Sequence, residues 1–240
     1  MKTGKTQWDR LLLGARAMTL AGDSGYGLIE DAAIGIAGHQ IVFAGRRADL
    51  PFAPDAMAER VELLSGALVA PGFIDAHTHL VFAGQRADEF EMRLNGASYA
   101  DIAQAGGGIL SSVRATRAAN EDELFAQSLP RARALLRDGV TTLEIKSGYG
   151  LDLDSERRQL RVARRIGKVL GIDVRCTYLA LHALPPEFTE RRADFVDVVC
   201  SDWLPRLHGE GLVDAVDAFC EKIGFTPEQT VREVERCLNC

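Results

Sequence analysis

The first part of the chain alternates apolar and polar residues in short runs, from Trp8 to about Leu64. Successive side chains of a strand point to opposite faces, so a period of two indicates β-strands. The clearest runs are 33–36 and 41–43, which flank Gly38, and glycine readily adopts the positive φ of a tight hairpin turn. We therefore predict a β segment over residues 1–68 that contains a hairpin around Gly38.

After Pro71 the pattern changes to apolar runs that are separated by longer stretches with helical spacing. This alternation is typical of an α/β fold, in which helices connect the strands of a parallel sheet or barrel. We place the boundary near residues 65–70 and assign residues 69–240 to a second domain. The predicted strands of that domain are 73–78, 140–146, 174–181 and 213–220.

The helix starts are marked by capping residues. Asn120 has Glu123 three residues later, which is the spacing of a capping box, and the run 226–229 repeats this pattern with a proline in the first turn. Apolar residues recur at helical spacing over 158–170, and a further helix is predicted over 188–207. Each predicted helix thus follows a predicted strand.

The composition narrows the class of partner. The chain has 28 Lys and Arg against 34 Asp and Glu, a formal net charge of −6, which argues against a dedicated binder of nucleic acid or anionic membranes. Small molecules are the expected partners. Five scattered cysteines make no disulfide framework and favour a reducing compartment, so we expect a cytoplasmic protein. The apolar run 11–13 is too short for a signal peptide or a membrane span.

Two histidines, His77 and His79, follow the apolar start of the first predicted strand of the second domain. Alternate residues of a strand face the same side, so both imidazoles are expected to point into one space. Two neutral imidazoles at this spacing supply half of a site for Zn²⁺ or another divalent metal. Coincidence is the alternative, although active sites of (β/α) barrels do lie at the carboxyl ends of strands.

Three further side chains could carry chemistry. Arg86 follows the first strand, and its guanidinium could hold a carboxylate through two parallel hydrogen bonds. Tyr149 stands in a glycine-flanked turn, where it either enters a pocket or anchors the turn. His182 ends the third strand and could donate to a carbonyl oxygen, or it could be a packing residue. For Arg86, a solvated arginine beside acidic residues is the alternative.

Other polar clusters have structural interpretations. Glu144 and Lys146 alternate on the second strand, and a buried ion pair is the preferred interpretation. The glycine run 106–108 could cradle an anion or form a loop, and it lacks the ending of a P-loop. The Cys237–Cys240 pair lacks a second pair of zinc ligands, so chance explains it better. A solvated outer face is the preferred interpretation of the basic stripe of Arg157, Arg161, Arg164, Arg165 and Lys168.

The segment 71–79, which reads PGFIDAHTH, resembles the signature of the amidohydrolase superfamily. Four further segments resemble the imidazolonepropionase family in the same order along the chain. The resemblance extends over roughly residues 8–229. The four segments are 82–90, 105–111, 144–150 and 182–187.

The resemblance implies a (β/α) barrel with a β-sandwich. Residues 71–240 are too few for a closed barrel, which takes ~250 residues, so we expect a partial TIM-like barrel of about four βα units with an N-terminal β-sandwich-type segment. It also implies that His77 and His79 bind one metal, Zn²⁺ or iron, per active site. Arg86, Tyr149 and His182 are then the substrate-binding residues, and His182 is also the catalytic residue.

The implied reaction is metal-dependent hydrolysis of the ring C–N bond of 4-imidazolone-5-propanoate to N-formimidoyl-L-glutamate, in histidine degradation. In the family a third metal-binding histidine and a base-acting aspartate come from later strands, which would lie beyond Cys240. We therefore expect little activity from the 240-residue chain by itself. The alternatives are another cyclic-amide or deaminase-type amidohydrolase, and an inactive fragment. A homodimer is a possible assembly, although the sequence does not determine the oligomeric state.

Overall fold

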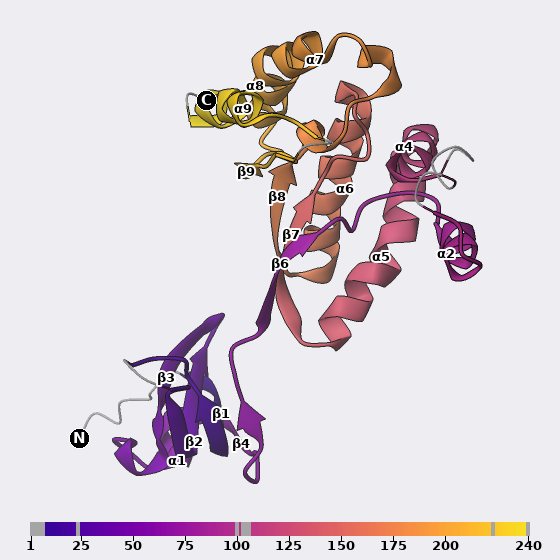
Figure 1. Cartoon of the computed structure of the whole chain (residues 1–240). Helices are drawn as coiled ribbons and strands as arrows, with labels where there is room; N and C mark the ends of the chain where they lie inside the picture. The colour runs from indigo at the N-terminus through magenta and orange to yellow at the C-terminus, as the bar shows by residue number, and fades with distance from the viewer. Residues whose placement is uncertain (1–7, 23–24, 99–100, 102–106, 222–223, 239–240) are drawn as a thin grey trace. The chain divides into compact units, whose positions relative to one another are not determined.

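The computed structural model describes residues 8–22, 25–98, 101, 107–221 and 224–238 of the chain. The contacts between residues divide the chain into an N-terminal unit, Met1–Pro71, and a second unit, Gly72–Cys240. Figure 1 shows strands throughout the first unit and alternating strands and helices in the second. Each unit is described below by itself.

The N-terminal unit is built on one mixed sheet. Its strands lie in the order β3-β2-β1-β4, with β5 beside β1 (Figure 1). The pairs β1–β2 and β2–β3 are antiparallel, whereas β4 and β5 run parallel to β1. The predicted hairpin is confirmed, and Gly38 has a φ of +57° in its turn. The elements are β1 (Trp8–Met18), β2 (Leu28–Ala37), β3 (Gln40–Arg46), η1 (Arg47–Asp49), α1 (Pro54–Met57), β4 (Ala58–Leu63) and β5 (Leu68–Val69).

A β-bulge in β1 lets this sheet bury both of its faces. Leu11 and Leu13 belong to one apolar cluster, while Ala15 and Ala17 belong to another, although all four have the same parity in the sequence. The pairing with β2 shifts between Leu13 and Ala15, and the residue between them, Gly14, has a φ of +71°. One extra residue moves the following side chains to the opposite face. The bulge therefore divides the strand between two cores.

The second unit contains a four-stranded parallel sheet, as the sequence predicts for a partial (β/α) barrel. The order is β6-β7-β8-β9, and each neighbouring pair is parallel. Helices follow the strands, and α5 and α6 pack on β7 and β8 (Figure 1). The strands are β6 (Phe73–Thr78), β7 (Val140–Lys146), β8 (Asp173–Tyr178) and β9 (Ala215–Val216).

Two predicted strands are shorter than expected. The predicted strand 174–181 ends at Tyr178, and a 3-10 turn, η2 (Ala180–His182), follows it. Of the predicted strand 213–220, only Ala215–Val216 is a strand. Asp214 explains the late start of β9, because its carboxylate accepts the hydrogen bond of the Cys176 N–H at 2.7 Å, which occupies a strand amide with a side chain.

Seven described helices complete the second unit. The capping box at Asn120 is confirmed, because Asn120 Oδ1 accepts from the Glu123 N–H at 3.0 Å and the Glu123 carboxylate accepts from the Asn120 N–H at 2.9 Å. Thr226 and Gln229 exchange the equivalent bonds before the last helix. The helices are α2 (Ala87–Leu94), α4 (Ile109–Ala118), α5 (Glu121–Arg137), α6 (Leu153–Leu170), α7 (Arg192–Val198), α8 (Leu204–Gly209) and α9 (Pro227–Leu238).

Two predicted helices have different bounds in the structure. The helix predicted over 158–170 begins at Leu153, because Asp152 caps it by accepting from the Ser155 N–H at 2.8 Å. The helix predicted over 188–207 is divided into η3 (Pro186–Phe188), α7, a π-helical turn at η4 (Val199–Trp203) and α8. Proline near the start of α8 lacks the N–H of an α-helical bond, and a wider π turn accommodates that loss.

The core of the second unit lies between the sheet and its helices. Leu143 and Ile145 of β7 and Leu160 and Ile166 of α6 are almost completely buried. On β6, in contrast, Phe73 is 62% exposed and Ile74 is 70% exposed. The described helices therefore enclose β7 but not β6. None of the described helices is long and apolar enough to cross a membrane.

Candidate active site at the ends of β6, β7 and β8

The two predicted metal ligands lie close together at the end of β6. The ring centroids of His77 and His79 are 5.5 Å apart, and the rings meet edge to face at 65°. His77 is exposed, whereas His79 is partly buried. The Nδ1 atom of His79 is itself buried and has no hydrogen-bond partner among the described residues. An unpartnered buried ring nitrogen beside a second imidazole fits two of the ligands of a divalent metal.

The surroundings of His79 keep its ring neutral. Burial, together with the nearby His182, His77 and Lys146, lowers the pKa of His79 to about 4, while a hydrogen bond with the Ser147 backbone opposes this shift. Neutral imidazole is the form that binds metals. Within the described part of the chain, no group of three or more His, Cys, Asp or Glu side chains is arranged to hold a metal ion. The described residues thus supply a pair of ligands.

The rings of Tyr149 and His182 pack against His79. The His182 ring is stacked on His79, with centroids 4.8 Å apart and an angle of 15° between the planes. The Tyr149 ring lies 5.3 Å from each of these two histidines, and Phe82 lies 5.9 Å from Tyr149. The lone pairs of two stacked imidazoles lie in parallel planes and do not aim at each other. His182 is therefore arranged as a neighbour of the histidine pair and not as a third converging ligand.

His182 is held in one tautomer by the turn after β7. Its Nδ1–H donates to the Gly148 carbonyl oxygen at 2.9 Å, because a carbonyl oxygen can only accept. Burial lowers the pKa of His182, while the bond to Gly148 and the charge of Asp217 oppose that shift. The neutral ring therefore presents Nε2 as an acceptor. The sequence-based expectation of a donor at His182 holds only for the protonated ring.

Arg86 and Tyr149 line one cavity, which has a volume of about 330 Å³. Arg86 is the N-cap residue of α2, and Tyr149 stands in the turn after β7. Burial raises the pKa of the Tyr149 phenol, and the nearby Arg86 opposes that shift. The cavity thus combines a cation, a neutral phenol and an aromatic wall. Its other lining residues are Phe82, Gly84, Gln85, Ser112 and Arg131.

The guanidinium of Arg86 is partly occupied by Glu89. Arg86 Nη2 lies 2.6 Å from Glu89 Oε2, and Nε donates to the same oxygen at 2.7 Å. The other oxygen of Glu89 accepts from the Gly108 N–H at 3.0 Å. Burial raises the pKa of the Glu89 carboxyl, but the bonds from Arg86 and Gly108 lower it more, so that the pKa lies below its usual range. Both sequence interpretations of Arg86 therefore apply, since it pairs with an acidic neighbour and also lines the cavity.

The predicted ion pair on β7 is confirmed and has a third member. Lys146 Nζ lies 2.8 Å from Glu144 Oε1 and 2.9 Å from Asp217 Oδ2, and its side chain is 6% exposed. Burial of Lys146 is outweighed by the two carboxylates, which raise its pKa. Thr177 of β8 also donates to Glu144, at 2.6 Å. The sequence did not indicate Asp217, because it lies 71 positions from Lys146.

The remaining clusters of the sequence analysis have structural roles or cannot be assessed. The predicted solvated face of the basic helix is confirmed only in part, because Arg161 and Lys168 are exposed, whereas the side chain of Arg157 is 15% exposed and pairs with Glu210. Gly106 and Cys240 lie outside the described residues, as does the side chain of Cys237.

Sequence reasoning missed Glu156 and Arg117, which contact the turn that carries Tyr149. Glycine-rich turns expose backbone N–H groups, so an acidic residue shortly after one is a weak signal, which does not distinguish Glu156 from the neighbouring acidic residues Asp152 and Asp154.

The chain is similar in sequence to three curated bacterial proteins called imidazolonepropionase, whereas no protein-family model matches it. It is 59% identical over 227 residues to the protein of Ralstonia nicotianae, which covers 94% of this chain and 55% of that relative. Its identity is 55% to the protein of Pseudomonas fluorescens and 57% to that of Pseudomonas aeruginosa, with 95% and 93% of this chain covered. The chain spans about half the length of these relatives.

Solved structures share the fold at lower identity. The triazine hydrolase of Arthrobacter aurescens matches 96% of this chain and 50% of its own chain, with a TM-score of 0.61 and 20% identity. The 5-methylcytosine deaminase of Klebsiella pneumoniae matches 95% of this chain and 48% of its own, with a TM-score of 0.59 and 15% identity. At these identities the likeness concerns the fold.

Proposed function

We propose that this chain, a homologue of imidazolonepropionases over 94% of its length, binds 4-imidazolone-5-propanoate for hydrolysis to N-formimidoyl-L-glutamate. In that reaction the oxygen of water bonds to the ring carbonyl carbon, the ring C–N bond breaks, and the leaving nitrogen takes up a proton. The observation that carries the proposal is the cavity between Arg86 and Tyr149, because the Tyr149 ring also contacts His79 and His182.

Arg86 is proposed to bind the propionate carboxylate. A guanidinium is planar and carries five N–H donors, so it can pair with a second carboxylate beside Glu89. The Arg86 side chain is 44% exposed, which leaves it accessible from the cavity. The Glu89 contact fixes the direction of the guanidinium before the substrate enters. An arginine oriented in this way loses little conformational entropy on binding.

Tyr149 and His182 are proposed to orient the imidazolone ring, with His182 as the catalytic residue nearest to the histidine pair. With the Nδ1 proton held by Gly148, the neutral His182 offers Nε2 as an acceptor for a polar hydrogen of the bound ring or of water. The Tyr149 hydroxyl is a neutral donor, because its pKa is raised by burial. Phe82 also lines the cavity, and its ring packs edge to face on the Tyr149 ring, which adds an apolar surface for the imidazolone ring.

His77 and His79 are proposed to hold one Zn²⁺ or iron ion, whose Lewis acidity would polarise the ring carbonyl and lower the pKa of bound water. The unpartnered Nδ1 atom of His79 supports this assignment from the structure of the chain itself. An atrazine chlorohydrolase variant with this fold, at a TM-score of 0.53, is complexed with zinc and atraton. The homodimer and the cytoplasmic location stay predictions of the sequence.

Replacing Arg86 with lysine tests the proposed function. Imidazole-4-propionate serves as a stable probe, and its binding to the zinc-loaded chain is measured by isothermal titration calorimetry. We expect Arg86→Lys to weaken probe binding about tenfold, because lysine cannot form the two parallel bonds of a guanidinium. Zinc binding, which depends on the histidine pair, should be unchanged.

Two controls make this experiment specific. Arg93→Lys changes an exposed arginine of the same helix, which does not line the cavity, and should leave probe binding as it is. Imidazole without the propionate group should bind the wild type and Arg86→Lys equally. Equal losses of probe and zinc binding in Arg86→Lys would contradict the proposed role.

A further inference from the structure

The turn that carries Tyr149 is bound through its N–H groups by one buried carboxylate. Glu156 of α6 is fully buried, and its Oε1 accepts from the N–H groups of Gly150 at 2.9 Å and Leu151 at 2.7 Å. Its Oε2 accepts from the Gly148 N–H at 3.0 Å. An ionised carboxylate accepts at both oxygens, whereas an amide side chain accepts at only one. Glu156 therefore accepts from all three N–H groups, whereas a glutamine at this position could not accept at both of its terminal atoms.

This turn has a backbone shape that it would not keep by itself. Gly148 has a φ of +104°, and Leu151 has a φ of +55° although it is not a glycine. A residue with a side chain adopts that region at an energetic cost, so the surrounding bonds must maintain it. Gly150 also lies so close to α6 that an added Cβ would stand 2.6 Å from the Glu156 nitrogen. The bonds to Glu156 are what hold the turn against the helix.

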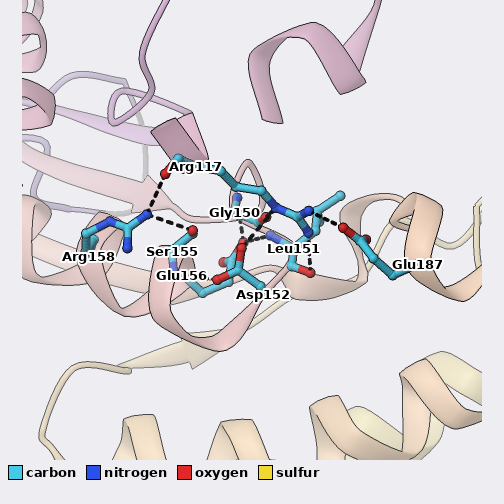
Figure 2. Close-up of polar contacts among 8 residues, drawn as sticks. All are labelled: Arg117, Gly150, Leu151, Asp152, Ser155, Glu156, Arg158 and Glu187. Atoms are coloured by element: carbon cyan, nitrogen blue, oxygen red, sulfur yellow. Dashed lines mark hydrogen bonds and ion pairs between the residues drawn. The ribbon is translucent and has the colours of Figure 1, made fainter. Parts of the chain in front are cut away.

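Arg117 of α4 binds the same turn through its carbonyl groups. Its Nε donates to the Gly150 oxygen at 2.7 Å, and its Nη2 donates to the Leu151 oxygen at 3.0 Å. The guanidinium also pairs with Asp152 at 2.9 Å and with Glu187 at 2.5 Å, and Glu187 follows β8. Figure 2 shows Arg117 between the turn and Glu187, with Glu156 at the turn's N–H groups.

This turn also determines the positions of two rings of the proposed substrate site, those of Tyr149 and His182. Tyr149 is its central residue, and the Gly148 oxygen accepts the Nδ1–H bond of His182. The contact with His182 is close, since an added Cβ at Gly148 would lie 3.0 Å from His182 Nδ1. A shift of the turn would therefore move Tyr149. It would also break the Gly148 bond that keeps the proton of His182 on Nδ1.

From these contacts we infer that Glu156 and Arg117 are positioning residues, which hold the 147–151 turn so that Tyr149 and His182 stay packed beside His79. They act through the turn and do not line the cavity. The inference rests on the proposed function for its consequence in substrate binding. The placement of the two rings, however, can be measured without any turnover.

The test uses the full chain with tyrosine labelled with ¹³C at the ring Cε positions, so that the NMR spectrum contains signals from only four rings. Tyr149→Phe identifies the Tyr149 signal, which the neighbouring rings of His79, His182 and Phe82 displace. The test variants are Glu156→Gln and Arg117→Gln. The matched controls are Ile166→Val, in the buried face of α6, and Arg165→Gln, which breaks the ion pair of Arg165 with Asp122.

We expect the Tyr149 signal to move toward its position in the urea-unfolded chain in both test variants. The buried Tyr178 of β8 should keep its signal, and so should Tyr149 in both controls. The variants should also bind imidazole-4-propionate about tenfold more weakly, with zinc binding unchanged. If the wild type binds no probe while the Tyr149 signal behaves as expected, the proposed function fails and the positioning role stands.

Two other results are informative. If Glu156→Gln unfolds the chain, so that the Tyr149 and Tyr178 signals both collapse, the partly exposed Arg117 decides the question through Arg117→Gln. A folded variant in which Tyr149 keeps its wild-type signal overturns the positioning role of the residue that was replaced.

Discussion

Strands β6 and β7 are neighbours in one sheet and carry successive parts of the candidate site, but their surroundings differ. In β7, Leu143 and Ile145 are buried under α5 and α6, and Lys146 is enclosed with its ion-pair partners. In β6, Phe73 and Ile74 are mostly exposed, and so is His77. Tyr149 and His182 therefore follow strands that are enclosed by helices, whereas the proposed metal ligands stand on an open strand and Arg86 caps the exposed helix α2.

This difference separates two properties of the site. The direction of Tyr149 and His182 is set by a turn that Glu156 binds inside the protein. The direction of His77 depends on a strand that pairs, among the described strands, with β7 alone. The described chain thus preorganises Tyr149 and His182 more than the proposed metal ligands.

The largest expected effect comes from shortening matched side chains on the two strands. Leu143→Ala in β7 should lower the free energy of unfolding by about 3 kcal/mol, because it leaves a cavity in a fully buried position. Ile74→Ala in β6 should change it by less than about 0.5 kcal/mol, because that side chain is already in water. Urea unfolding followed by circular dichroism measures both. Similar losses in the two variants would remove the contrast between the strands.

The second prediction concerns a buried carboxyl group on α9, the helix that packs against η4 and β9 on the enclosed side of the sheet. Glu233 of α9 is buried without a hydrogen-bond partner among the described residues. Burial, together with the charges of Asp217 and Glu156, raises its pKa to about 9. The folded chain therefore binds this proton more tightly than the unfolded chain. Its stability should fall as the pH rises from about 4.5 to about 9.

Glu233→Gln should remove this pH-dependent loss. We expect the variant to be more stable than the wild type by about 2 kcal/mol at pH 8 and equally stable at pH 4. We expect a gain smaller than the full shift in pKa, because helices can open locally at less cost than global unfolding. Urea unfolding at the two pH values measures it, and the exposed Glu235→Gln on the same helix serves as the control. A wild-type stability that rises between pH 5 and pH 8 relative to Glu233→Gln would refute the prediction.

The smallest effect concerns the cap of α5, the helix that covers β7. Asn120→Ala removes the acceptor of the Glu123 N–H and should cost about 1 kcal/mol of unfolding free energy. Asn120→Asp keeps an acceptor at the same place and should cost less than half as much. The thermal midpoint of unfolding reports both changes. Equal destabilisation by the two variants would show that the cap does not stabilise the helix.

Features that depend on residues a few positions apart could be predicted from the sequence. The capping boxes at Asn120 and Thr226 need only the residue three positions later, and the hairpin at Gly38 needs only its turn. The undivided helix predicted over 188–207 was wrong, because residues 189–191 are not helical and a π-helical turn lies between α7 and α8, and hydrophobic periodicity detects neither feature. The start of β9 was predicted too early, because the side chain of Asp214 bonds to a strand amide 38 positions away.

In the candidate site, too, local spacing predicts some residues, whereas others are brought together only by the fold. The spacing of His77 and His79 places them together from strand geometry alone, whereas Arg86 and Tyr149 were singled out by the family resemblance. Glu156 could not be ranked from the sequence, because its partners are backbone N–H groups that any residue except proline supplies. Asp217 was missed because only the fold brings it to Lys146.

The strand pairing also sets an order of events during synthesis. In the N-terminal sheet, β1 and β2 pair antiparallel across a short connection, for example Met18 with Leu28. In the second sheet, Phe73 of β6 pairs with Val140, which follows it by 67 positions. At about 10 residues per second, the ribosome leaves β6 without its partner for about 7 s. Its apolar side chains are then exposed to solvent. We therefore expect chaperones that bind nascent chains to bind at β6.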